Sequence, residues 1–147
     1  MHAVNYSAIL FSMLITKHQI IMVLVSAVCQ WLLGWLWFGL LFRKSWRALV
    51  GFAEGEKPKN AVFGMVTAFV ASLLLSYVLV HVLGWAGAIT FTGGAKLAVI
   101  CWLGFMAPPL FTQHIHENRR VNLFAINAAY WLLAMALAGG ILAAFHG

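Results

Sequence analysis

The chain has 147 residues, of which 64% are hydrophobic and 8% are charged, and its formal net charge is +6. A soluble domain carries about a quarter charged residues, and one of this length could not bury so much apolar surface. The composition therefore excludes an ordinary soluble domain and predicts an all-α, polytopic integral membrane protein. We expect the excess of Lys and Arg to meet membrane lipids rather than nucleic acid.

Residues 1–19 begin with an apolar stretch that is shorter than the roughly 20 residues of a spanning helix, so we expect a short N-terminal interfacial helix there. Residues 20–147 form the second predicted unit, a four-helix transmembrane domain. Its spanning helices are expected at about 20–42, 61–83, 95–112 and 121–145. Pro108 and Pro109 remove two backbone donors, which predicts a kink or an end near the close of the third helix.

The positive charge is concentrated in two loops, at 43–60 and 113–120, which hold seven of the nine Lys and Arg residues. With four spans both loops fall on one side, as the positive-inside rule requires. This predicts a membrane protein with both basic loops cytoplasmic and both termini outside. Lipid headgroup contacts are expected from six cations: Arg43, Lys44, Arg47, Lys96, Arg119 and Arg120.

Small residues recur at helical spacing and predict close helix packing, because they let helix backbones approach in lipid. Such stripes serve contacts within one fold and contacts between subunits equally well, and with the small size of the chain they favour a homo-oligomer. The expected packing positions are Gly34, Gly39, Gly64, Ala68, Ser72, Ser76, Ala136, Gly140 and Ala144.

Four polar side chains are expected inside the membrane: Gln30, His81, Asn127 and Tyr130. Polar groups are costly in hydrocarbon unless they are paired. The first interpretation is hydrogen bonding between helices. The second is a polar path near Gln30 and Asn127. His81 has no second membrane-centre His to pair with it around a macrocycle, so a hydrogen-bonded interfacial His is preferred and no cofactor is predicted.

The loop histidines His114 and His116, beside Glu117, have the residue types of a metal site and share a side in an extended segment. They are too few for a zinc site, so no metal is predicted. The chain contains no Asp, and its three carboxylates, Glu54, Glu56 and Glu117, lie in loops. This argues against an intramembrane carboxylate relay and excludes a Ser-His-Asp triad, so we expect no enzyme.

Two stretches resemble each other and suggest an internal repeat. Leu33-Gly34-Trp35 followed by Leu41-Phe42 is similar to Leu103-Gly104-Phe105 followed by Leu110-Phe111, and a basic loop follows each. Two parallel helical hairpins give this pattern. The second and fourth helices match poorly, so a four-helix bundle with and without a repeat both stay open.

The stretch from Leu33 to Trp46 resembles the Gly-x-Leu-Trp-Tyr-Gly-x-Leu-Phe-x-Lys-x-Trp signature of a bacterial membrane family, domain of unknown function 1761. The second conserved half of that family resembles 102–108 and 123–130, so the resemblance covers about 22–145. Trp131 departs from the pattern, because the family commonly has His at this place. The matching residues of the first motif are Gly34, Leu36, Trp37, Phe38 in place of Tyr, Gly39, Leu41, Phe42, Lys44 and Trp46.

The resemblance implies four spanning helices and no established activity. Two functions follow as expectations. The first is a structural or accessory subunit that acts through helix–helix and lipid contacts. The alternative is a small oligomeric transporter or channel with a polar path near Gln30 and Asn127.

Overall fold

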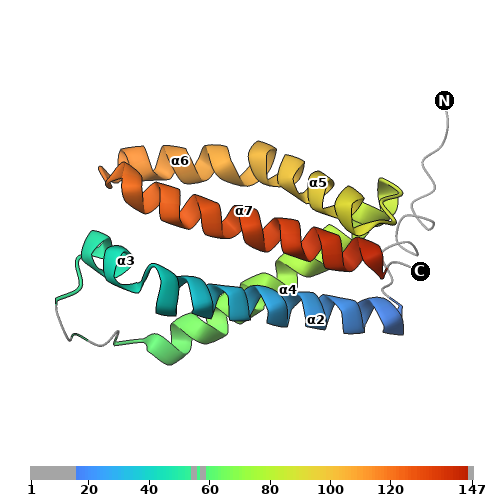
Figure 1. Cartoon of the computed structure of the whole chain (residues 1–147), viewed down its shortest axis with the longest axis horizontal. Helices are drawn as coiled ribbons and strands as arrows, with labels where there is room; N and C mark the ends of the chain where they lie inside the picture. The colour runs from blue at the N-terminus through green and yellow to red at the C-terminus, as the bar shows by residue number, and fades with distance from the viewer. Residues whose placement is uncertain (1–15, 54–55, 57–58, 146–147) are drawn as a thin grey trace, which may run out of the picture.

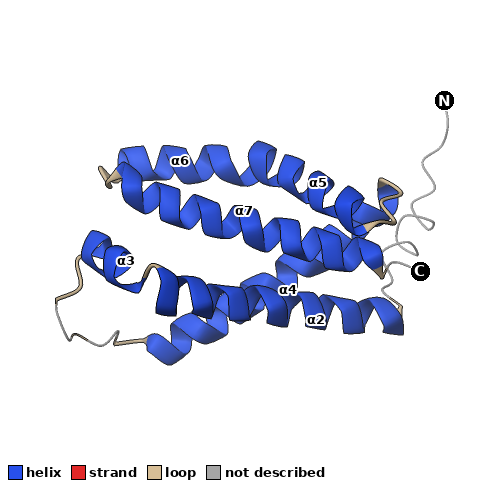
Figure 2. Cartoon of the chain, in the orientation of Figure 1, coloured by secondary structure: helices blue, strands red, loops and turns tan. Residues whose placement is uncertain are grey.

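The computed structural model describes residues 16–53, 56 and 59–145, and these residues form helices and connecting loops without a strand (Figure 2). Residues 1–15 of the predicted interfacial segment lie outside this part of the chain. In order, the elements are α2 (Lys17–Leu36), the π-helical segment η1 (Trp37–Leu41), α3 (Arg43–Val50), α4 (Ala61–Trp85), α5 (Phe91–Cys101), the π-helical segment η2 (Trp102–Met106), α6 (Ala107–His116) and α7 (Val121–Ala144).

Four helical stretches are long and apolar enough to cross a membrane: Lys17–Leu41, Ala61–Trp85, Phe91–His116 and Val121–Ala144. Each has 24 to 26 residues. At about 1.5 Å per residue they measure roughly 36 to 39 Å, which exceeds the roughly 30 Å hydrocarbon core of a bilayer. Large apolar side chains such as Phe63 and Phe105 are more than 70% exposed. Both features are consistent with a membrane protein.

The four stretches alternate in direction, so that α2 and α5 run one way and α4 and α7 run the other (Figure 1). Helix α7 lies between the other elements: α5 packs along one side of it, and α2 and α4 contact it from the other. The buried apolar core joins α2, α4, α5 and α7 and consists of Val23, Leu79, Val80, Leu83, Ala98, Met135, Ala138, Leu142 and Ala143.

The third long stretch is longer than predicted at both ends. It begins at Phe91 because the Thr90 hydroxyl accepts a hydrogen bond from the Gly93 amide at 3.1 Å, which caps α5. It continues to His116 because Pro108 and Pro109 lie in the first turn of α6, where missing amide donors cost little. The helix ends where Asn118 adopts a left-handed backbone with φ 52°.

The two π-helical segments begin at Trp37 and Trp102. Their sequences, WFGLL and WLGFM, share the pattern Trp-x-Gly. In the first, the Phe42 amide donates to the Trp37 carbonyl at 2.8 Å, five residues back. Such segments insert an extra residue into a helix and often accompany a bend. The third stretch therefore bends through η2, just before the prolines.

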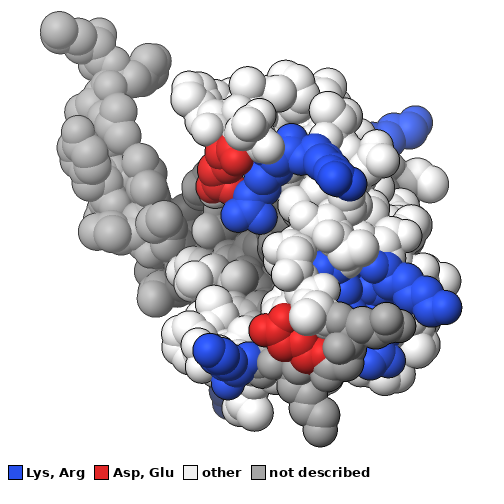
Figure 3. All heavy atoms as spheres, turned by 90° about the vertical axis from the view of Figure 1, so that its left-hand side faces the viewer, with Lys and Arg blue, Asp and Glu red and all other residues white. Residues whose placement is uncertain are grey.

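Both charged loops lie at one end of the molecule, together with α3 and the turn between α6 and α7 (Figure 1). Figure 3 faces this end, where Lys and Arg side chains are spread over the surface and carboxylates occupy two smaller patches. Lys17 is the first residue of α2 and Lys96 lies in the second turn of α5, and both helices start at the opposite end.

Candidate functional site

The largest fully buried polar side chain of the described helices is Gln30 of α2, whose exposed fraction is 0%. Its Nε2 donates to the Ser76 hydroxyl of α4 at 2.7 Å. The same nitrogen lies 3.4 Å from both the hydroxyl and the carbonyl oxygen of Ser26. The Ser76 hydroxyl in turn donates to the Ser26 hydroxyl at 3.1 Å. We call Ser26, Gln30 and Ser76 the polar cluster.

Helical spacing explains why these three residues meet. Ser26 and Gln30 are four residues apart and therefore share a face of α2. Ser72 and Ser76 share a face of α4 in the same way, and both are buried. Because small side chains bring the two backbones close, the Gln30 amide reaches across to Ser76 without a gap. Ser72 instead donates to the Ala68 carbonyl of its own helix at 3.0 Å.

Tyr130 of α7 closes the polar cluster from the third side. Its hydroxyl lies 3.4 Å from the Gln30 carbonyl oxygen, a long hydrogen bond. Gly34, one turn after Gln30, makes room for the ring: a Cβ on Gly34 would lie 3.0 Å from the Tyr130 hydroxyl oxygen. Three helices thus meet at Gln30: α2 and α4 at its side-chain amide, and α7 at its main-chain carbonyl.

Gln30 retains one unused atom. Its Oε1 is buried and has no hydrogen-bond partner among the described residues. An unsatisfied buried acceptor costs about 1–3 kcal/mol. The polar cluster is therefore a partly satisfied network, which fixes the register of α2 against α4 at some cost in stability.

Asn127 is half-buried on α7 and is not brought to Gln30: in the part of the chain that the structure describes, no hydrogen bond joins the two side chains. The neighbouring contact with α7 is made by Trp37 of η1, whose indole Nε1 donates to the Ile126 carbonyl at 3.1 Å. Trp31 makes a similar bond to the Met65 carbonyl of α4 at 3.2 Å.

His81 lies away from the polar cluster, toward the end of α4. It is buried, and aromatic side chains one turn before and after cover it: the ring centroids of Tyr77 and Trp85 are 4.9 and 6.2 Å away. Its Nε2 has no partner among the described residues.

The predicted packing positions fall into two groups. Gly34, Ser72, Ser76 and Gly140 contact neighbouring helices, Gly140 because Phe91 of α5 lies where its Cβ would be. Ala136 is half-buried. The nearest atoms to a Cβ on Gly39 belong to Trp35 of the preceding turn, and a Cβ on Gly64 would meet nothing within 4 Å. Ala68 and Ala144 are exposed.

The closest helix crossing was not among these positions. A Cβ on Gly94 of α5 would overlap the Gly139 carbonyl oxygen of α7, and a Cβ on Gly139 would overlap the Gly94 carbonyl oxygen. The available signal was the pair of Gly-Gly steps, Gly93-Gly94 and Gly139-Gly140. Ser26 was also missed, although it lies four residues before Gln30.

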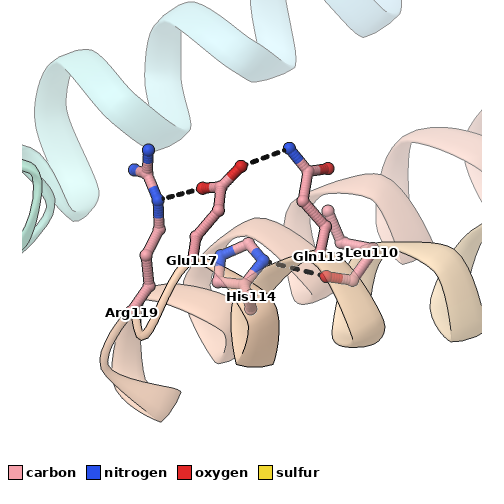
Figure 4. A network of polar contacts seen from close by, with 5 residues as sticks. All are labelled: Leu110, Gln113, His114, Glu117 and Arg119. Carbon is pink, nitrogen blue, oxygen red and sulfur yellow. Dashed lines mark hydrogen bonds and ion pairs between the residues drawn. The ribbon is translucent and has the colours of Figure 1, made fainter.

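The histidine pair of the second loop lies on a helix instead of an extended segment. His114 and His116 belong to α6, so their side chains point about 200° apart around its axis. His114 is buried, and its Nδ1 donates to the Leu110 carbonyl at 2.9 Å (Figure 4). His116 is exposed, and its Nδ1 donates to the Thr112 carbonyl at 2.9 Å. No three of the described His, Cys, Asp and Glu side chains cluster well enough to hold a metal.

One predicted headgroup cation is paired internally. Arg119 donates to the Glu117 carboxylate, which also accepts from the Gln113 amide at 2.8 Å (Figure 4). These two hydrogen bonds, that from Gln113 first, hold the pKa of Glu117 below its ordinary value. Arg43, Lys44, Lys96 and Arg120 are exposed, and Arg47 is half-buried.

A family model described as a protein of unknown function matches residues 21–143. This range contains the whole polar cluster, Tyr130, both π-helical segments and the Gly94–Gly139 crossing. No curated protein and no solved structure matches the chain.

Proposed function

Because this chain belongs to the DUF1761 family, whose description assigns no activity, we propose its function from geometry: a structural or accessory subunit of the membrane. It acts through helix–helix and lipid contacts and carries out no catalysis. One observation carries the proposal, which is that the Gln30 side chain has no exposed surface and its Nε2 bonds Ser26 and Ser76.

The enclosure of Gln30 argues against a polar path through one subunit. A side chain that lines a water-filled path keeps part of its polar surface accessible, whereas the Gln30 side chain is fully buried and the Tyr130 hydroxyl reaches its main-chain carbonyl. Its hydrogen bonds hold helices together, as polar side chains commonly do in lipid.

We further propose a four-helix bundle of two parallel hairpins, α2–α4 and α5–α7. The support is that both π-helical segments begin at a Trp-x-Gly sequence and that each lies in the first long helix of its hairpin. The extensive α2–α4 and α5–α7 packing supports the same pairing.

The proposed orientation puts α3 and the α6–α7 turn in the cytoplasm of a bacterium and both termini outside the inner membrane. The support is the gathering of Lys and Arg at that end of the molecule. The protein assembles as a homo-oligomer through the exposed Gly64–Ala68 part of α4, where added side chains would meet nothing of the same subunit at Gly64.

Solute flux through proteoliposomes tests the accessory role against transport. We expect no ion or small-solute flux above that of protein-free vesicles. A flux that Gln30→Leu abolishes, while the matched exposed change Gln113→Leu leaves it intact, would overturn the accessory role and favour a path at the polar cluster.

Disulfide cross-linking in the membrane tests the oligomer. In a background of Cys29→Ser and Cys101→Ser, Gly64→Cys should cross-link two copies, while Gly104→Cys, equally free of neighbours within 4 Å, should not. Native mass spectrometry that finds only monomer in lipid, with no cross-link at either position, would refute the oligomer.

A further inference from the structure

The cations at the α3 end differ in how much of their charge is already used. Among the described residues, Arg119 forms an ion pair with Glu117. Arg47 donates to the Glu56 carbonyl and lies 5.0 Å over the Phe52 ring.

Arg43 and Lys44 are exposed, and neither makes an ion pair or side-chain hydrogen bond within the described residues. The two carboxylates of this end that the structure describes, Glu56 and Glu117, are also occupied. Glu117 accepts from Gln113 and Arg119, and Glu56 Oε2 accepts from the Ala53 amide at 2.9 Å. The positive charges at the start of α3 are therefore not neutralised by a described carboxylate.

Aromatic contacts hold α3 close to the end of the first apolar stretch. Trp46 packs against Phe38 of η1 and against Phe52, with ring centroids 5.5 and 6.1 Å apart. Arg43 follows the last residue of the first apolar stretch, Leu41, by two positions. The cations of α3 therefore begin where the apolar surface ends, and in the proposed membrane orientation this is the level of the lipid phosphates. A Trp side chain at this level is typical of a membrane–water interface.

Arg43 and Lys44 are adjacent in the first turn of α3. A guanidinium binds a phosphate through two parallel hydrogen bonds, and the neighbouring ammonium adds a second positive charge. We propose that Arg43 and Lys44 form a binding site for the phosphate headgroup of an anionic phospholipid in the adjoining leaflet. This rests on the proposed membrane role and names the lipid class that the α3 end selects.

A phospholipid fits this site better than a soluble phosphate. The aromatic side chains Phe38 and Trp46 and the exposed Leu40 and Leu41 lie directly beside the cations along the chain. They offer acyl chains an apolar surface next to the charge, whereas a free phosphate ion has no apolar part that could pack against it.

Native mass spectrometry of the whole chain, released from nanodiscs of equal phosphatidylglycerol and phosphatidylcholine, tests the site. We expect retained phosphatidylglycerol to exceed phosphatidylcholine. Removing an exposed cation that has no partner within the protein should lower the ratio of retained phosphatidylglycerol to phosphatidylcholine about fivefold. Arg43→Gln should show this loss, whereas Arg119→Gln, at the same end and with the same change in charge, should lose less than about twofold.

Equal losses in the two variants would mean that only total charge matters, and would overturn the site. The same holds if wild-type protein retains both lipids equally, or if excess inorganic phosphate displaces the lipid where chloride at equal ionic strength does not. Protein that enters nanodiscs without lipid preference refutes this inference alone. Protein that fails to enter nanodiscs of either lipid refutes the membrane role with it. Both variants change exposed side chains, and circular dichroism checks their helicity.

Discussion

Tyr130 stands directly against Gly34: a Cβ on this glycine would lie 3.0 Å from the tyrosine hydroxyl oxygen, and the same hydroxyl reaches the Gln30 carbonyl one turn away. The contact joins α7 to α2 beside the polar cluster. Gly34 is therefore needed for space and not for backbone freedom, since it lies within the regular helix α2.

Replacing Gly34 by Val should destabilise the protein by about 1–3 kcal/mol, because the added methyl groups push Tyr130 off its position. Unfolding in mixed micelles measures the change. The matched control is Gly64→Val, where nothing lies within 4 Å. In a double-mutant cycle, Tyr130→Phe should recover part of the loss of Gly34→Ala, and strict additivity of the two changes would contradict the contact.

Ser76→Ala and Gln30→Leu should act in opposite ways on the polar cluster. Ser76→Ala leaves the Gln30 amide without its 2.7 Å partner, which should cost about 1–2 kcal/mol of stability. Gln30→Leu removes the amide together with its unpaired Oε1, while Ser26 and Ser76 still bond each other, so stability should stay unchanged or rise. A large loss on Gln30→Leu, measured in the same unfolding assay, would mean that Oε1 has a partner.

Gly94→Ala should be among the most destabilising single changes in the chain, at about 2–3 kcal/mol, because its Cβ meets the Gly139 backbone and not a movable side chain. Gly104→Ala, in the same long stretch, has nothing within 4 Å and should be neutral or slightly stabilising. Equal unfolding midpoints for these two variants would show that α5 and α7 do not cross at Gly94.

The Glu117 carboxylate should titrate below its ordinary pKa of 4.5. The Gln113 and Arg119 hydrogen bonds favour its charged form, so its contribution to stability is present above pH 4.5 and is lost as the pH falls through the lowered pKa. Carbon-13 NMR of the carboxyl group gives the midpoint. Gln113→Leu and Arg119→Gln should each raise it, whereas Lys96→Gln at the other end should leave it in place.

Much of the architecture was predictable from the sequence, and the family confirms the resemblance seen at Gly34–Trp46. Four long apolar stretches and their charged loops depend on composition alone, which a single chain displays directly. The partner of Gln30 was not predictable in this way. Its face of α2 could meet Asn127 or Ser76, and the relative register of two helices decides between them. The Gly94–Gly139 crossing depends on register for the same reason.

The π-helical segments could not be read from hydrophobic spacing either, because a Trp-x-Gly sequence also fits an ordinary helix. Pro108 and Pro109 did signal the bend in the third stretch. They could not indicate that the extra residue precedes them at η2, nor that a similar one interrupts the first stretch where no proline is present.

Each π-helical segment acts as a phase shift along its helix. One inserted residue turns everything after it by about 100° around the axis. A helical wheel drawn without interruption from Lys17 to Val50 therefore assigns α3 to the wrong faces, and one drawn from Phe91 to His116 does the same for α6. In the first stretch the non-helical residue Phe42 adds a further change of direction, so two local features, η1 and Phe42, together set where Arg43 and Lys44 point.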